Sequence, residues 1–175
     1  MSAVSEAIEV ELTDPSGEPL RIEWRAEALA GIEPASPDQG PVWRLGGELD
    51  WDEVDALRIV SGRLDDGRLT AIAALRPSDA RGHGEEAVAG LLGDSTALDP
   101  LAEALLSTEY GPDGLPSRVG LELYRDGGGL PARIAGDVTA TAASEQGGVR
   151  RLSAALVLRS SGSGGTGVLD VLTRT

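Results

Sequence analysis

The sequence predicts an all-β fold, and within that class an antiparallel meander β-barrel with little helix. Three consecutive runs in the C-terminal half, residues 119–124, 132–143 and 149–159, alternate apolar and polar residues with a period of two. Such alternation is typical of half-buried β-strands. Glycine-rich turns at 126–129 and 145–148 join the runs, and glycine readily adopts the left-handed conformations that tight hairpins need. Hairpins that follow one another in this way favour a meander over a Greek key.

Two further hairpins precede these runs. Residues 7–13 and 20–26 alternate in the same way, and residues 57–64 and 69–76 flank an Asp-Gly turn at 65–68, which is a strong local hairpin signal. The inward-facing side chains of the second hairpin are expected to include small alanines, which either meet bulky partners or leave room for a ligand. These inward positions are Leu57, Ile59 or Val60, Leu69, Ala71, Ala73 and Leu75.

The remaining segments complete about nine or ten strands in a single domain, residues 1–175. Residues 98–110 allow two interpretations. Asp99 and Pro100 favour the start of a helix, whereas the residues that lead into Tyr110 favour a strand, which we prefer. Residues 160–166, rich in serine and glycine, are expected to be flexible. The other expected strands are 42–45, 85–92 and 167–173.

Composition excludes several classes of function. The formal net charge is −14, so the chain lacks the basic surface that binding to nucleic acid or to an anionic membrane requires. All 15 cationic residues are arginine, which excludes Schiff-base chemistry on lysine, and the chain has no cysteine for a disulfide or a thiol nucleophile. No secretory signal is apparent, which predicts a cytoplasmic location. We expect no cofactor and no metal site.

His83 is the only histidine, and histidine is the side chain whose ordinary pKa lies nearest neutrality. Glycines flank it and a predicted strand follows, so it is expected at a barrel end, where the pockets of such barrels open. The cluster of Arg81, His83, Glu85 and Glu86 could hold a general base with an orienting carboxylate. If the protein is an enzyme, we predict that His83 and Glu85 are catalytic, with Arg81 binding the ligand beside them. The alternative is an exposed histidine in a turn. The walls of the pocket are predicted to be Trp43, Trp51 and Tyr110.

Two polar groups allow alternative interpretations. Trp43 and Trp51 lie close to a run of acidic residues at 50–55, which is compatible with a cation or sugar site but more often forms a solvated loop over packed tryptophans. Arg133 and Asp137 share one face of a predicted strand, expected on the outside of the barrel. Pointing inward, the same pair would form the polar patch of a ligand pocket.

Three short motifs suggest a family. Gly-Arg-Leu-Asp-Asp-Gly-Arg at 62–68, Arg-Gly-His-Gly-Glu at 81–85 and Arg-Ile-Ala-Gly-Asp at 133–137 precede a closing glycine-rich strand. In this order they resemble the lipocalin-like carotenoid hydratases of the hydroxyneurosporene synthase type and related cyclases, over residues 51–175. The resemblance implies a lipocalin-like barrel with an apolar cavity. Members commonly carry two such domains and this chain has room for one, so no catalytic residue is carried over.

The sequence leaves three functions open. The first is a binding module for an apolar small molecule, polyene or terpenoid-like, held inside the barrel. The second is an isomerase, cyclase or hydratase for such a molecule, which can act through containment and one or two acid/base groups. The third is a structural or interaction domain with a filled core. The sequence does not decide whether the protein is an enzyme. A homodimer is compatible with it, because exposed strand edges can pair.

Overall fold

The computed structural model describes residues 7–33, 41–79 and 86–175, and β-strands dominate them. Nine strands form one antiparallel sheet in the order β7-β6-β5-β4-β12-β11-β10-β9-β8, and three form a smaller sheet, β1-β2-β3. The predicted all-β meander is therefore confirmed. The described residues hold twelve strands, because β1–β3 form a separate sheet beside the nine strands of the barrel. The elements are β1 (Ala7–Thr13), β2 (Pro19–Arg25), α1 (Ala26–Ala30), β3 (Trp43–Leu45), β4 (Val54–Leu64), β5 (Leu69–Pro77), β6 (Ala87–Gly93), β7 (Leu98–Pro100), β8 (Glu103–Tyr110), β9 (Pro116–Tyr124), β10 (Ala132–Gln146), β11 (Val149–Ser160) and β12 (Ser163–Arg174).

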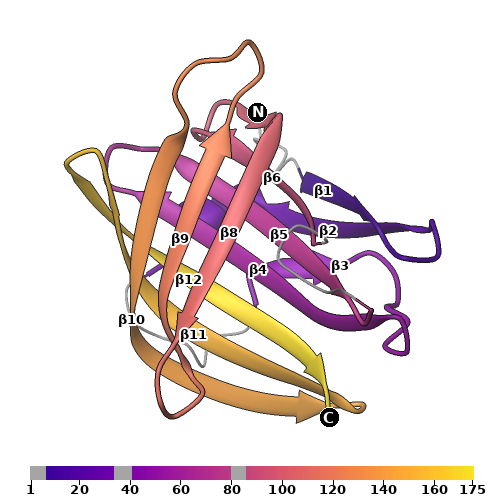
Figure 1. The fold of residues 1–175 in the computed structure, drawn as a ribbon. Helices are drawn as coiled ribbons and strands as arrows, with labels where there is room; N and C mark the ends of the chain where they lie inside the picture. The colour runs from indigo at the N-terminus through magenta and orange to yellow at the C-terminus, as the bar shows by residue number, and fades with distance from the viewer. Residues whose placement is uncertain (1–6, 34–40, 80–85) are drawn as a thin grey trace.

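The nine-stranded sheet curls into a half-barrel, with β8–β10 along one side and β4–β6 along the other (Figure 1). One continuous stretch of chain joins the two sides at a corner. The amide of Leu101 donates to the carbonyl of Gly90 in β6 at 2.9 Å, and the next amide, of Ala102, donates to Tyr124 at the end of β9 at 2.8 Å. Beyond this corner, β6 and β8 are not paired with each other in the part of the chain that the structure describes. The barrel is therefore closed at the β7–β8 corner and has an unpaired seam between β6 and β8.

Apolar side chains fill part of the barrel. Val60, Ile72 and Leu92 are 0–1% exposed, which places them at the centre of one cluster. Burial of each such side chain contributes about 1.5–3 kcal/mol. The buried members of this cluster are Val60, Leu64, Ile72, Ala74, Leu92, Ala104, Leu106, Val119, Leu121, Leu123, Ile134, Ala154, Leu156, Leu158, Leu169 and Val171.

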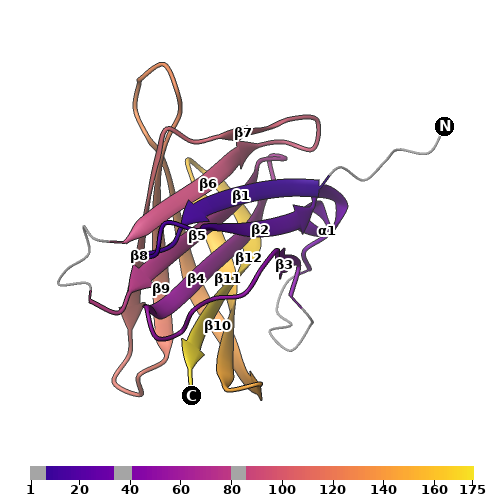
Figure 2. The same ribbon diagram turned by 90° about the vertical axis from the view of Figure 1, so that its right-hand side faces the viewer.

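The smaller sheet and α1 cover the outer face of β4–β6, so these strands are buried on both faces (Figure 2). Most of the side chains expected to point into the barrel pack instead against this layer, beside Ile22 and Trp24. The prediction for these positions is wrong, and only Val60, the alternative to Ile59, faces the barrel. A strand buried on both faces has no polar face to distinguish its two sides. The positions that face the second layer are Leu57, Ile59, Leu69, Ala71, Ala73 and Leu75.

Residues 160–166 form a tight hairpin, so the expected flexible stretch is wrong. β11 ends at Ser160 and β12 begins at Ser163, which leaves a two-residue turn. Ser161 and Gly162 both have positive φ angles, 47° and 79°. A turn with two positive φ angles matches the twist of paired antiparallel strands. Serine and glycine are common both in flexible linkers and in such turns, so composition alone gave the wrong choice.

Two other predictions are confirmed. The ambiguous segment 98–110 contains strands β7 and β8 in place of a helix. Arg133 and Asp137 lie on the outer face of β10, where the arginine is 3.2 Å from Glu122 and the aspartate accepts a hydrogen bond from Arg159. That hydrogen bond, together with one from Arg118, lowers the pKa of Asp137 below its ordinary value.

In the described residues, the nine-stranded sheet has free strand edges at β7 and the part of β6 beside it, at β8 and in the second half of β10. β8 is the last strand of the nine, and β10 pairs with β9 only over residues 132–137. Residues 140–146 of β10 pair with β11 alone. These edges are where a second copy of the chain could add a strand. The homodimer stays a prediction.

Candidate functional site

A buried arginine lies inside the barrel beside the seam. Arg58 and Val60 share the inward face of β4, because alternate residues of a strand point to the same side. The side chain of Arg58 is 10% exposed. Its Nη1 donates to Thr108 Oγ1 at 2.7 Å, and its Nη2 donates to the carboxylate of Glu86 and, at 3.3 Å, to the carbonyl of Leu106. Thr108 and Leu106 belong to β8, whereas Glu86 directly precedes β6. The guanidinium therefore connects the two sides of the seam.

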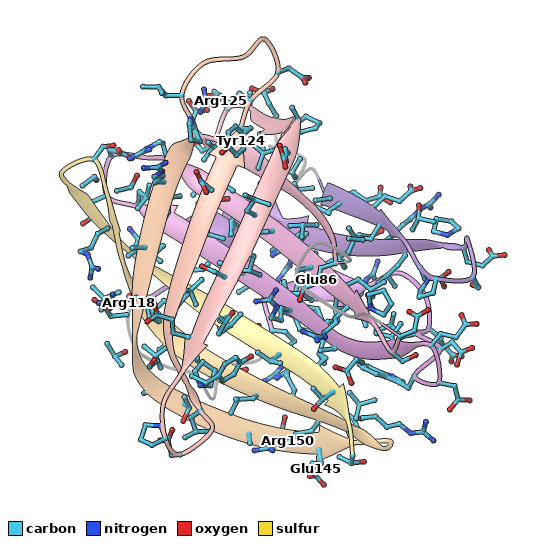
Figure 3. All side chains as sticks on the ribbon, viewed as in Figure 1. Glu86, Arg118, Tyr124, Arg125, Glu145 and Arg150 are labelled. Carbon is cyan, nitrogen blue, oxygen red and sulfur yellow. The ribbon has the colours of Figure 1, made fainter. Side chains whose placement is uncertain are left out.

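Glu86, labelled in Figure 3, supplies the buried carboxylate of this cluster. Its side chain is 6% exposed. Oε2 accepts the hydrogen bond from Arg58, and Oε1 lies 4.0 Å from Nη1 of Arg76. An unpaired carboxylate at this depth would be costly to remove from water, and the guanidinium of Arg58 compensates that cost. The pair fixes one polar group in an otherwise apolar interior.

Arg76 is the second arginine of the cluster, and it is held more loosely. It ends the inward row of β5, two residues after Ala74, and pairs in register with Ala56 of β4. Its side chain is 36% exposed, and its Nε lies 3.5 Å from Asp55, whose own side chain is 64% exposed. These are ion pairs without a hydrogen bond. The cluster therefore has one arginine held by three hydrogen bonds, Arg58, and one arginine, Arg76, that donates no hydrogen bond to the described residues.

A hollow adjoins this cluster. Its volume is about 1350 Å³, but residues from both faces of β8–β10 border it, so the whole volume is not a single barrel cavity. Exposed Leu105 belongs to the outer part, whereas its neighbour Leu106 belongs to the inner part, beside Arg58 and Glu86. The inner part has mostly apolar walls. The inward-facing residues that border it with the cluster are Ala56, Val88, Leu106, Thr108, Tyr110, Leu121, Ile134, Val171 and Thr173.

The structure separates the site residues that the sequence suggested. His83, Glu85 and Arg81 lie outside the described residues. Tyr110 borders the hollow and is 53% exposed. Trp43 and Trp51 instead contribute to the core beneath the smaller sheet. The tryptophans therefore do not border the hollow that Tyr110 borders, and the acidic run near them accompanies tryptophans packed on a core. No group of three or more His, Asp or Glu side chains that could hold a metal exists among the described residues.

A second buried polar cluster centres on Asp170, between the two sheets. This aspartate of β12 is 2% exposed and points away from the barrel interior. It accepts hydrogen bonds from the indole Nε1 of Trp43 at 2.7 Å and from the hydroxyl of Ser153, and Arg151 lies 3.8 Å away. Burial raises its pKa above the ordinary 3.8, and the two hydrogen bonds and Arg151 oppose that rise. The cluster attaches the smaller sheet to the barrel.

Another indole makes a similar attachment. Trp24 of β2 donates from Nε1 to the hydroxyl of Ser61 in β4 at 2.8 Å, and both residues are at most 1% exposed. Buried indole N–H groups need such acceptors, since an unpaired donor is costly. Two tryptophans of the smaller sheet thus bond to polar residues on the outer face of the barrel.

Sequence reasoning missed Arg58 and Arg76 as site residues, and it considered Glu86 only as a member of the charged cluster around His83. Arg58 stands between Leu57 and Ile59, and a lone charge in an alternating strand normally faces solvent. The only available signal was the position of Glu86, which directly follows the predicted 81–85 motif. Comparison with known proteins adds no further assignment: no family model matches the chain, and no curated protein matches it.

Proposed function

We propose that the half-barrel binds an apolar small molecule, polyene or terpenoid-like, in the inner hollow. The observation that supports this is the change of lining along the barrel. Apolar side chains fill one part, whereas the part beside the seam has apolar walls around a few fixed polar groups, Arg58, Glu86 and Thr108. Pockets for small molecules typically combine an apolar lining with a small number of placed polar groups.

Catalysis as an isomerase, cyclase or hydratase is the second candidate, and Glu86 favours it. The carboxylate is buried, borders the hollow and has one oxygen, Oε1, that accepts no hydrogen bond from the described residues. A carboxylate placed in this way can accept a proton or stabilise positive charge that develops on a polyene. His83 and Glu85, predicted to be catalytic, directly precede it in the sequence.

Retinol, an apolar polyene with useful fluorescence, provides a test of binding. Val88→Trp would fill the inner hollow, because Val88 borders it from β6. Ala135→Trp is the matched control, since Ala135 borders only the outer part of the hollow, on β10. We expect the parent protein and Ala135→Trp to bind retinol, and Val88→Trp to bind at least tenfold more weakly, a loss of about 1.4 kcal/mol. Absence of binding by the parent, or an equal effect of both substitutions, would refute the proposal.

Turnover separates an enzyme from a binding module. Retinol and a longer carotenoid would be incubated with the protein, and isomerised, cyclised or hydrated products would be sought by chromatography and mass spectrometry. If the protein is an enzyme, Glu86→Gln should keep retinol binding within about twofold and lower turnover by at least 10²-fold, which is the usual contribution of a general acid or base. Binding without any product supports the binding module.

The remaining expectations belong to this proposal as well. A net charge of −14 supports partners other than nucleic acid and anionic membranes. A cytoplasmic location is proposed on the sequence alone. The free edge of β10 at residues 140–146, which pair with β11 on their other side, is the place where a homodimer would form, by antiparallel pairing of two copies.

A further inference from the structure

Arg76 has hydrogen-bonding capacity that the described residues do not use. Among the described residues it contributes only the two ion pairs, at 3.5 Å to Asp55 and at 4.0 Å to Glu86. A guanidinium carries five N–H donors arranged as a planar fork, which suits a carboxylate that accepts two of them at once. Arg58, in contrast, uses both of its Nη atoms on three fixed acceptors. Arg76 itself borders the hollow.

The charges around Arg76 leave it available to a ligand. Glu86 already has a close partner in Arg58. The side chain of Asp55 is 64% exposed, and an exposed ion pair of this kind contributes little stability, so a ligand can replace it at small cost. Thr108 also borders the hollow; its oxygen accepts from Arg58, and its O–H donates no hydrogen bond to the described residues.

The surroundings of Arg76 also suit an apolar chain attached to such a head group. Ala56 is opposite Arg76 in the β4–β5 register, and Val88 lies on the next strand, β6. Both border the hollow, as does Val171 of β12. Partial exposure of the arginine places the charged end near solvent, where desolvating an anion costs less than in the packed interior.

Resting on the function proposed above, we infer that the ligand of the inner hollow carries a carboxylate, which binds the guanidinium of Arg76, with its apolar body along Ala56, Val88 and Val171. The ligand class is thus an apolar carboxylic acid, and Arg76 determines the preference for the acid over the corresponding alcohol. Charge complementarity and the free fork of donors support this class.

Retinoic acid and retinol test this inference, because they share one polyene body and differ in the head group. Affinities of the full-length protein for both would be measured by titration calorimetry at neutral pH. The parent should bind the acid at least tenfold more tightly than the alcohol. Arg76→Gln should remove that preference and leave retinol affinity within about twofold, a change of at most ~0.4 kcal/mol. Arg133→Gln, which removes a 77% exposed arginine from the outer face, should leave both affinities unchanged.

The possible results distinguish failure of the carboxylate inference from failure of the proposed function. Equal binding of acid and alcohol by the parent overturns the carboxylate inference while the proposed function stands, and this comparison needs no variant to fold. A similar loss of both ligands in Arg76→Gln, with an unchanged thermal transition, also overturns it. Binding of neither probe overturns the proposed function and the inference together.

Discussion

Two of the buried polar clusters in the described residues differ in what surrounds them. Arg58 and Glu86 lie inside the barrel, next to a hollow and beside the seam between β6 and β8. Asp170 and Trp43 lie between the barrel and the smaller sheet, where apolar side chains enclose them on both sides. The first cluster joins two strands that share no backbone pairing. The second joins two sheets.

The comparison shows that burial of charged groups alone does not mark a ligand site. Both clusters carry the cost of removing charged groups from water, and both reduce it with hydrogen bonds. Only the cluster of Arg58 adjoins space that a ligand could occupy, and only it includes a loosely held cation, Arg76. Asp170 has no such access, so its burial serves the attachment of β3 to β12.

Removal of Arg58 should have the largest effect on stability. Arg58→Met keeps an apolar stem in place but leaves the carboxylate of Glu86 buried without its main partner. We expect the free energy of unfolding, measured by urea denaturation, to fall by about 3–5 kcal/mol, as for other buried pairs that lose one partner. Arg133→Met, which breaks an exposed pair on the outer face, should cost about 0–1 kcal/mol.

A double variant tests whether the stability lost in Arg58→Met comes from the carboxylate of Glu86 that is left without its partner. Arg58→Met combined with Glu86→Gln removes both charges, so most of the lost stability should return. If Arg58→Met lowers the free energy of unfolding no more than Arg133→Met does, then Arg58 does not stabilise the seam between β6 and β8. The Arg58 and Asp170 clusters could then no longer be compared as two buried clusters that both stabilise the fold.

Asp170→Ala should have an intermediate effect. The substitution leaves the indole N–H of Trp43 and the hydroxyl of Ser153 buried without their acceptor, which costs about 1–3 kcal/mol of unfolding free energy. Because Asp170 lies on the side of the sheet away from the hollow, retinol affinity should stay within about twofold of the parent, ~0.4 kcal/mol. A large loss of retinol affinity in a folded Asp170→Ala protein would show that the Asp170 cluster also affects ligand binding. The proposed difference between the two clusters would then be wrong.

Most strands could be predicted from the sequence, because the alternation of residues 119–159 and the glycine-rich turns are local signals. The two buried clusters could not. Arg58 follows Leu57 and Asp170 follows Leu169, so each is a single polar residue in an apolar strand, the pattern of a solvated outer face. Curling of the sheet buries the first and the smaller sheet covers the second. Both events depend on contacts between distant segments, which periodicity does not encode.

The candidate site shows the same limit. Tyr110 was predicted to line a pocket and does border the hollow, whereas Trp43 and Trp51 were grouped with it and lie beneath the smaller sheet. The sequence contains no sign that β1–β3 form a separate layer, since their alternation equals that of the barrel strands. Aromatic residues alone therefore could not indicate which of two cores they join.

The smallest effect, and the one most specific to the buried cluster around Asp170, is the dependence of stability on pH. Asp170→Asn keeps an acceptor for Trp43 and a polar partner for Ser153, so near pH 3 the variant and the parent should be similarly stable. Burial raises the pKa of Asp170 in the folded protein above 3.8, despite the hydrogen bonds and Arg151. The protonated form therefore contributes stability that is present below the unfolded-state pKa and is lost as the pH rises through the folded-state pKa.

The stability of Asp170→Asn relative to the parent should thus increase as the pH rises from about 3.5, and level off above the folded-state pKa. Urea unfolding of both proteins across this range measures the difference. Asp137→Asn is the control of opposite sign, because the hydrogen bond from Arg159 lowers the pKa of Asp137. For this pair of proteins, the stability of the parent relative to Asp137→Asn should increase as the pH rises from the folded-state pKa of Asp137 toward the ordinary value of 3.8. The contrary result is a difference in stability between Asp170→Asn and the parent that stays constant with pH, or that changes with the sign expected for Asp137. Either result would show that solvent reaches Asp170, and the contrast between its cluster and the cluster of Arg58 beside the hollow would fail.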